Sequence, residues 1–376
     1  MRWSHLAILA LLLLPAAACL AQGAAPDAIA SWTFDADTEG WQLFDPTGDL
    51  TTTDDPKIAR ENGGGALQYG YTAKEAQITA VLVPTEAGLA GAKSLHYWIR
   101  TSEYAMVMNM IIERDESRYV AQFTSIPGRW QEVWLDLSEF RLEGDSTDEN
   151  GQLDADQIAT VGFADATGLL AGAAKTVTFL VAPDLGPRQL WLDDFSVTTK
   201  SIQPRWQEIT LVGRPAVRFE SFERAPLEWF VLAGKGVEAE YDAQFKADGD
   251  FSLRLQYDLP AGKVFGAMTP LSGVPLQGAK SLSLAVMSET ATTLLIELKE
   301  SDESKYQTTV PVQVGDKFQI INLSLDQFRL DDNSKDENGR LDPEQIKEMT
   351  VADISVMTGN PVSTNTLWLD DFVFGK

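Results

Sequence analysis

Short runs of alternating apolar and polar residues fill most of the chain after about residue 29. Typical runs are SLHYWIR (94–100), RYVAQFT (118–124) and FQIINLSL (318–325), with Gly, Pro and Asp between such runs. A period of two places every second side chain on the same face of a β-strand. Many short strands separated by turn residues predict an all-β fold, and we expect β-sandwich or jelly-roll domains.

This pattern of predicted strands and turns occurs twice along the chain. Four segments return with small changes 177 to 188 positions later: GAKSL (91–95), DESRY (115–119), FRLEGDSTDENGQLDADQI (140–158) and LWLDDF (190–195). Solenoid repeats are about 20–50 residues long, whereas each copy here has the length of a domain. We therefore predict two tandem domains at 29–199 and 216–376, joined by a linker at 200–215.

The longest repeated segment contains an acidic turn signal. DENGQLDADQI (148–158) returns as DENGRLDPEQI (336–346). The Asn-Gly pair is typical of a turn, and Asp154 with Gln157 has the spacing of a capping box that begins a helix. In the second copy Pro343 stands at the first helical position, which tolerates proline. We therefore expect a turn followed by a short helix in each domain.

A calcium loop is the competing interpretation of this segment. Asp148 and Asn150 have the spacing of ligands in an EF-hand loop. However, the first and last ligand positions of that loop hold Ser146 and Gln157 instead of acidic residues, and the second copy has the same defects. The segment is thus a poor match to a calcium loop of this class.

The N-terminus resembles an export signal. Arg2 precedes the apolar run LAILALLLLPAAA (6–18), and small residues follow, so we interpret residues 1–21 as a signal peptide. The run is too short to cross a bilayer, and no other stretch approaches the length of a transmembrane helix. We expect an exported protein that is periplasmic, attached to the cell surface or extracellular.

Cys19 is the only cysteine of the chain. It follows small residues in PAAACLAQ, which resembles a bacterial lipoprotein box, so that the signal would end at 18 and Cys19 would carry lipid. Ala16 departs from that box, which usually has leucine there. Ordinary cleavage after Ala21 or Gly23 is the alternative. In either case the mature domains have no disulfide.

Composition narrows the choice of partners. The chain has 55 acidic and 30 basic residues and a formal net charge of −25, which disfavours nucleic acid and anionic lipid surfaces as partners. Its 44% hydrophobic residues are enough for a packed core, so the chain is not disordered.

Both copies resemble galactose-binding-like jelly-roll domains. The order of a W-x-x-V-x-L-D-L-S-x-F segment (130–140), the DENG turn and a final LWLDDF strand is similar to family 11 carbohydrate-binding modules and to complex I intermediate-associated domains. The resemblance implies a ligand-binding face or rim and one structural calcium per domain, where the first and last strands meet. The positions that match are Asp35, Asp193 and Asp194 in the first copy and Glu223, Asp370 and Asp371 in the second.

The aspartates of LWLDDF are predicted to lie on a strand, where one of them would point into the core. On a regular strand Trp191, Asp193 and Phe195 share one face, and a carboxylate on a core face needs a metal or a hydrogen-bond donor. Hard oxygen ligands suit calcium. The alternative is that backbone N–H groups satisfy these aspartates without any metal.

The strand after GAKSL differs between the copies on one face. One face is apolar in both copies and is expected to point into the core. The other face carries His96, Trp98 and Arg100 in the first copy, against Ser, Ala and Met in the second, and Met108 lies on the matching face of the next strand. A tryptophan flanked by polar groups is typical of a sugar-stacking surface, so we predict a ligand site at these four residues. There are two alternatives. The strand could be shifted by one residue, which would turn these side chains into the core, or this face could pack against the other domain.

Catalysis has little support. His96 is the only histidine beyond the N-terminal segment, and the chain has neither a phosphate-binding glycine loop nor a zinc motif. We therefore predict a non-catalytic protein that binds polysaccharide or another glycan through tandem modules. An envelope structural or assembly protein with a protein partner is the alternative, and a glycan-acting enzyme using paired carboxylates is a weaker one.

Overall fold

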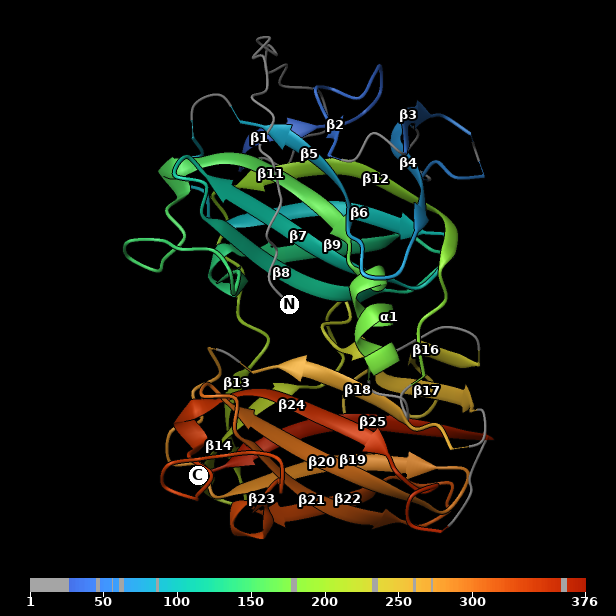
Figure 1. Ribbon diagram of the computed structural model, residues 1–376, viewed down its shortest axis with the longest axis vertical. Helices are drawn as coiled ribbons and strands as arrows, with labels where there is room; N and C mark the ends of the chain where they lie inside the picture. Colours follow the sequence, from blue (N-terminus) through green and yellow to red (C-terminus); the bar gives the residue numbers. More distant parts are fainter. Residues whose placement is uncertain are drawn as a thin grey trace. The chain divides into compact units, whose positions relative to one another are not determined.

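The computed structural model describes residues 27–44, 48–55, 57–60, 64–85, 88–176, 181–231, 236–259, 262–271, 273–359 and 364–376. The chain divides into two compact units, the first formed by Met1–Gly168 and Leu185–Gln203 and the second by Leu169–Asp184 and Pro204–Lys376. Each unit is an antiparallel sandwich of two sheets (Figure 1). This confirms the predicted all-β fold with two tandem sandwich domains.

The first unit consists of sheets I and II. Sheet I has the order β3-β4-β12-β6-β9, with β1 beside β12, and sheet II has the order β10-β8-β7-β11-β5-β2. Consecutive strands pass repeatedly from one sheet to the other, as in a jelly roll. The bounds are β1 Ala28–Trp32, β2 Gln42–Leu43, β3 Asp49–Thr53, β4 Ala66–Ala73, β5 Thr79–Pro84, β6 Ser94–Thr101, β7 Ala105–Glu113, β8 Arg118–Ser125, β9 Gln131–Asp136, β10 Arg141–Leu142, β11 Ile158–Asp165 and β12 Gly186–Thr198. The α-helix α1, Thr167–Thr176, follows β11.

The second unit repeats this arrangement in sheets III and IV. Sheet III has the order β13-β14-β25-β17-β16, with β19 and β22 continuing beyond β25, and sheet IV has the order β15-β18-β24-β20-β21-β23. The bounds are β13 Gln207–Leu211, β14 Arg214–Glu220, β15 Phe230–Val231, β16 Val237–Asp242, β17 Ser252–Asp258, β18 Phe265–Pro270, β19 Ser281–Ser288, β20 Thr292–Glu300, β21 Lys305–Val312, β22 Gln319–Ser324, β23 Arg329–Leu330, β24 Ile346–Asp353 and β25 Thr364–Gly375. The segment 200–215, predicted as a linker, contains β13 and the start of β14.

An aromatic cluster fills the core of the first unit between its two sheets. The Trp41 ring stacks on Phe163 with 5.4 Å between centroids, and Phe195 packs edge-on against both rings. Tyr97 joins the cluster from β6 and is fully buried. Such large rings contribute much of the apolar area that a sandwich of this size buries.

The DENG segment forms a turn followed by one turn of 3₁₀-helix, Ala155–Gln157 in the first unit and Pro343–Gln345 in the second. Pro343 occupies the first helical position, as predicted. The predicted capping box is wrong, because the Asp154 carboxylate does not bond to the helix N–H groups and instead accepts a hydrogen bond from Asn150 Nδ2 at 2.9 Å. Strand β11 begins immediately after the turn, so buried Ile158 belongs to the strand and leaves no room for a longer helix.

Candidate ligand-binding site

The outward surface of sheet I carries the aromatic residues of the candidate site. Strand β6 points Leu95, Tyr97 and Ile99 into the core, where each is at most 1% exposed. Its alternate residues His96, Trp98 and Arg100 therefore point outward, and all three are half-buried. The structure thus places three of the four predicted ligand residues together on one face.

Two further tryptophans lie on this face, and the sequence analysis did not assign them to it. In the sheet register, Trp134 of β9 is opposite His96, and Trp191 of β12 is opposite Arg100. Residues directly opposite each other in a sheet point to the same side. We call the outward surface formed by Trp98, Trp134, Trp191, His96 and Arg100 the tryptophan face. Trp134 could have been predicted from the alternation in QEVWLD, because it lies between the core residues Val133 and Leu135 and therefore points to the opposite face.

A β-bulge decides which side of β12 faces outward. The register of β12 against β6 shifts between Asp193 and Ser196, and Asp194 has a φ of 49°, in the left-handed region. The extra residue turns Phe195 into the core, where it is 0% exposed, whereas Trp191 and Asp193 point outward. The expectation that Trp191, Asp193 and Phe195 share one face is therefore wrong. Strand β25 has the same bulge at Asp371, with a φ of 47°.

Asp193 is a buried carboxylate beside an arginine. Arg60 Nη1 lies 3.2 Å from Asp193 Oδ2 and 2.6 Å from Asp194 Oδ2. Burial, reinforced by the neighbouring Asp194 charge, raises the pKa of Asp193 to about 6. The guanidinium already supplies a cation to the two carboxylates, and a calcium ion would have to displace it. The fit of this pair to the expected calcium is poor.

The remaining residues predicted to bind calcium also have protein donors. Asp35 Oδ1 accepts a hydrogen bond from the Gly65 N–H at 3.0 Å. Three acidic residues of the second unit have such donors: Glu223 the N–H groups of Asp250 and Phe251, Asp370 those of Ala247 and Asp248, and Asp371 the Arg218 guanidinium. Protein groups thus donate to these carboxylates, as expected if the sites hold no metal. A calcium ion at the strand ends stays a prediction.

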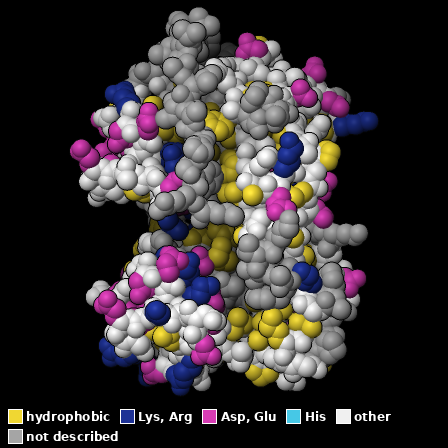
Figure 2. All heavy atoms as spheres, viewed as in Figure 1, with side chains coloured by type: hydrophobic (Ala, Val, Ile, Leu, Met, Phe, Trp, Pro, Cys, Tyr) yellow, Lys and Arg dark blue, Asp and Glu magenta, His cyan; other side chains and the backbone are white. Residues whose placement is uncertain are grey.

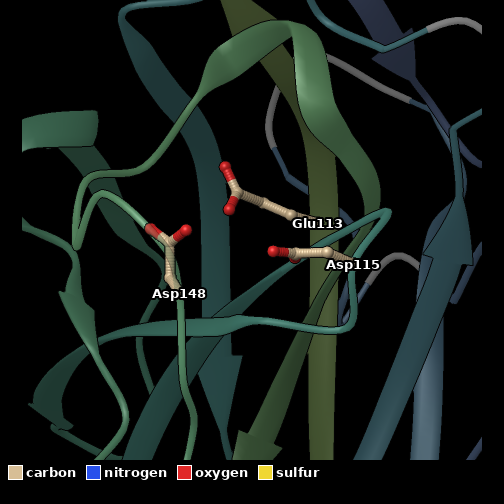
Figure 3. A group of neighbouring side chains, drawn as sticks. All are labelled: Glu113, Asp115 and Asp148. Carbon is tan, nitrogen blue, oxygen red and sulfur yellow. The ribbon is translucent and has the colours of Figure 1, made fainter.

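The described residues contain two other groups of carboxylates, one in each unit. They are Glu113, Asp115 and Asp148 (Figure 3), and Glu300, Asp302 and Asp336, in which one oxygen from each residue lies within 4.8 Å of the others. Each group joins the repeated acidic motif after β7 or β20 to the repeated DENG turn. Sequence analysis saw both motifs repeat but not that they meet in space.

Protein donors contact the carboxylates of the first group. Ser117 Oγ donates to Glu113 at 2.8 Å and also to Asp115, and the Tyr119 hydroxyl donates to Asp148. Burial raises the pKa of Glu113, whereas the Tyr119 hydrogen bond lowers the pKa of Asp148. Oxygen-rich groups of this kind suit calcium in general. Here the contacts tie the DENG turn to the β7–β8 hairpin.

His96 and Trp134 form a stacked pair on the tryptophan face. Their ring centroids are 4.0 Å apart, and His96 Nε2 lies 2.9 Å from Glu132 Oε1. Burial lowers the pKa of His96, although the Glu132 carboxylate acts in the opposite direction. Lys200 Nζ lies 4.0 Å from the centroid of the Trp134 ring. The neutral imidazole therefore extends the aromatic surface at neutral pH.

Met108 does not belong to this face. It lies on β7 in sheet II, is 3% exposed, and contacts Gln122 Nε2 through its sulfur at 3.3 Å. The neighbours Val107 and Ile111 point into the core that sheet II shares with sheet I, so Met108 points away from that core on the other side of the sandwich. Figure 2 shows hydrophobic side chains on this side of the first unit. The predicted grouping of Met108 with Trp98 is therefore wrong.

The matching face of the second unit is different. Ala285 of β19 replaces Trp98, and it is 0% exposed. Trp368 of β25 corresponds to Trp191, and the two are similarly buried, at 5% and 6% exposed; the Trp368 ring packs against Phe245, with 5.2 Å between centroids. The difference between the units therefore lies at Trp98 and Trp134, which are partly exposed in the first unit and are replaced by Ala285 and Asn322 in the second.

The predicted signal peptide and the predicted absence of a transmembrane helix concern different parts of the chain. Residues 1–21, including Cys19, lie outside the described residues, so the signal peptide and the lipid anchor stay predictions. Among the helices that the structure describes, none combines the length and the apolar character needed to cross a membrane.

Neither protein-family models nor curated proteins match this chain. Several solved structures are similar to it. A family 11 carbohydrate-binding module from Clostridium thermocellum, in complex with a β-1,3-1,4-mixed-linked tetrasaccharide, has 14% identity and a TM-score of 0.35, over 42% of this chain and 94% of that one. The tandem CBM22-1–CBM22-2 domains of Paenibacillus barcinonensis Xyn10C have 11% identity and a TM-score of 0.30, over 94% and 99%. An exo-β-agarase has 12% identity and a TM-score of 0.34, over 47% of this chain and 26% of that one. At these identities and TM-scores the similarities support no conclusion about the ligand or the function of this chain.

Proposed function

We propose that this is an exported, non-catalytic protein that binds a polysaccharide through the tryptophan face of the first unit. The observation that supports this is the grouping of the partly exposed Trp98 and Trp134 on adjacent strands, with the buried Trp191 on the strand on the other side of β6. Indole rings bury the apolar C–H face of a pyranose, and the flanking N–H groups bind its hydroxyls. Adjacent strands are about 4.8 Å apart, so the rings span a surface large enough for more than one sugar unit.

The proposal assigns ligand binding to one unit. Because Ala285 and Asn322 occupy the positions of Trp98 and Trp134 in the second unit, two equal sites on one polymer are not expected, and avidity between the units does not contribute.

The test is a binding screen of the mature protein against insoluble polysaccharides and a glycan array. Two variants introduce the residues of the second unit at the corresponding positions, Trp98→Ala and Trp134→Asn, and these residues are compatible with the fold because the second unit has Ala285 and Asn322 there. We expect each to weaken binding at least about tenfold, which corresponds to about 1.4 kcal/mol. Asn322→Ala, at an exposed position of β22, is the matched control and should bind as the parent does.

The outcomes separate the candidate functions. Binding that persists in both tryptophan variants would place the saccharide outside the tryptophan face. Absence of binding to every glycan would refute the proposal and favour the envelope protein with a protein partner. Turnover of any polysaccharide on the same panel would instead support a glycan-acting enzyme.

A further inference from the structure

Four residues of the first unit, Lys57–Arg60, lie over the tryptophan face, and we call them the strap. The guanidinium carbon of Arg60 is 4.2 Å from the centroid of the Trp98 ring, so a flat cation covers the ring on which a sugar would stack. The Lys57 carbonyl accepts a hydrogen bond from Arg100 Nη1 at 3.1 Å, and the Ile58 carbonyl accepts one from Trp130 Nε1 at 2.7 Å. The contacts of Arg60 with Trp98 and of Lys57 with Arg100 are a stacking contact and a polar contact that a saccharide on this face would make.

We infer that the strap is a built-in competitor of the saccharide: ligand reaches Trp98 and Arg100 only when Lys57–Arg60 is displaced, and Arg60 sets the affinity of the site. The inference rests on the proposed function and describes the regulation of the same face. A ligand that pays the free energy of displacing the strap binds more weakly than it would to an uncovered face.

The strap is held by polar contacts that can exchange with a ligand. Arg60 pairs with Asp193 and Asp194, and the Ile58 and Ala59 N–H groups bond to the Asp55 carbonyl within the strap's own turn. Lys57 is exposed, and Ile58 and Ala59 are half-buried, whereas the Arg60 side chain is only 11% exposed. Segments with few buried apolar contacts open at a lower free-energy cost than core strands.

The strap is also an imperfect occupant of the face. Among the residues that the structure describes, the buried Nε atom of Arg100 has no hydrogen-bond partner, although Nη1 bonds to the strap. A buried donor without an acceptor is costly, so an added acceptor such as a sugar hydroxyl would be favoured there. The strap therefore leaves unused part of the hydrogen-bonding capacity of the face.

In the second unit, a loop packs over the equivalent face through an aromatic ring and backbone hydrogen bonds. The loop between β16 and β17, which corresponds to the loop that contains the strap, packs the Phe245 ring against Trp368. In this loop the Ala247 and Asp248 N–H groups bond to Asp370, which is 0% exposed. An apolar ring and backbone hydrogen bonds to a fully buried carboxylate close that face, whereas the cover of the first unit is polar and partly exposed.

The test compares saccharide binding by the parent and by Arg60→Gln, using the polysaccharide that binds best in the screen. The glutamine amide can still donate to Asp193 or Asp194 but carries no charge and no guanidinium plane, so we expect an affinity about five- to tenfold higher than that of the parent. Arg254→Gln is the matched control, because Arg254 lies on the outward face of β17 beside Trp368 and pairs with Glu240 in the second unit. It should leave the affinity unchanged.

Each outcome bears on the inference. Tighter binding by Arg60→Gln than by the parent supports a competing strap. Equal or weaker binding by Arg60→Gln, with clear binding by the parent, overturns the inference and leaves the proposed function intact. No binding by either protein overturns both. If Arg60→Gln does not fold, the double variant Arg60→Gln/Asp194→Asn removes one of the two carboxylate charges that Arg60 pairs with, tolerates the left-handed backbone at 194, and is judged by the same criteria.

Discussion

Tyr97 and Asn109 form a polar contact inside the core of the first unit, and its removal should be costly. The Tyr97 hydroxyl donates to Asn109 Oδ1 at 2.5 Å, and both side chains are 0% exposed. Tyr97→Phe keeps the ring contact with Phe163 but leaves the amide oxygen buried without this donor. An unsatisfied buried acceptor costs about 1–3 kcal/mol, so we expect the first unit to lose that amount of stability.

The second unit shows how the loss can be repaired. Leu284 and Ile296 stand at the positions of Tyr97 and Asn109, and both are at most 1% exposed. The double variant Tyr97→Phe/Asn109→Ile removes both polar partners, as the second unit does. Replacing both partners by apolar groups of similar size is close to neutral, so we expect the double variant to recover most of the loss, to within about 1 kcal/mol of the parent.

Calorimetry of the full mature chain is the assay, because two units can unfold in separate transitions and a single midpoint would mix them. For a domain of this size, 1 kcal/mol shifts the midpoint by about 2–4 °C. Only the transition of the first unit should move. A shift below about 0.5 kcal/mol in Tyr97→Phe, or a double variant less stable than that single variant, would refute the reasoning.

Two further predictions concern a buried charge and a strained turn. Burial raises the pKa of Asp370 to about 6, above its unfolded value, so the folded state binds more protons than the unfolded state between about pH 4 and 6 and stability falls as the pH rises through this window. Asp370→Asn lacks this titration. In thermal scans the melting temperature of the parent should therefore fall relative to that of the variant as the pH rises from 4.5 to 7.5. A difference in melting temperature that stays constant over this range would contradict the raised pKa. Val212 is 94% exposed and has a φ of 50°, which is unfavourable for a β-branched residue. Val212→Asn should therefore raise the stability of the second unit by about 0.5–1 kcal/mol in denaturant unfolding, and a loss of stability would show that the turn is not strained.

Much of the fold could be predicted from local pattern and internal repetition. Alternation in SLHYWIR identified both faces of β6, and the direct repeat identified two copies of one sandwich. The site could be predicted only in part. Trp98, His96 and Arg100 follow from one strand, but their grouping with Trp134 and Trp191 depends on the order of β9, β6 and β12 in sheet I. That order is a non-local property, and no single segment encodes it.

The sequence by itself determined which residues of a regular strand face the core, because alternation is a consequence of strand geometry that acts between near neighbours. Tertiary structure alone decided the rest. The bulge at Asp194 reverses the expected side of Phe195, since one extra residue shifts the register against β6. The strap reaches Trp98 because Arg60 meets Asp193 and Asp194, carboxylates more than 130 positions away along the chain. Contacts across such separations depend on how the sheets bring strands together, which local pattern does not record.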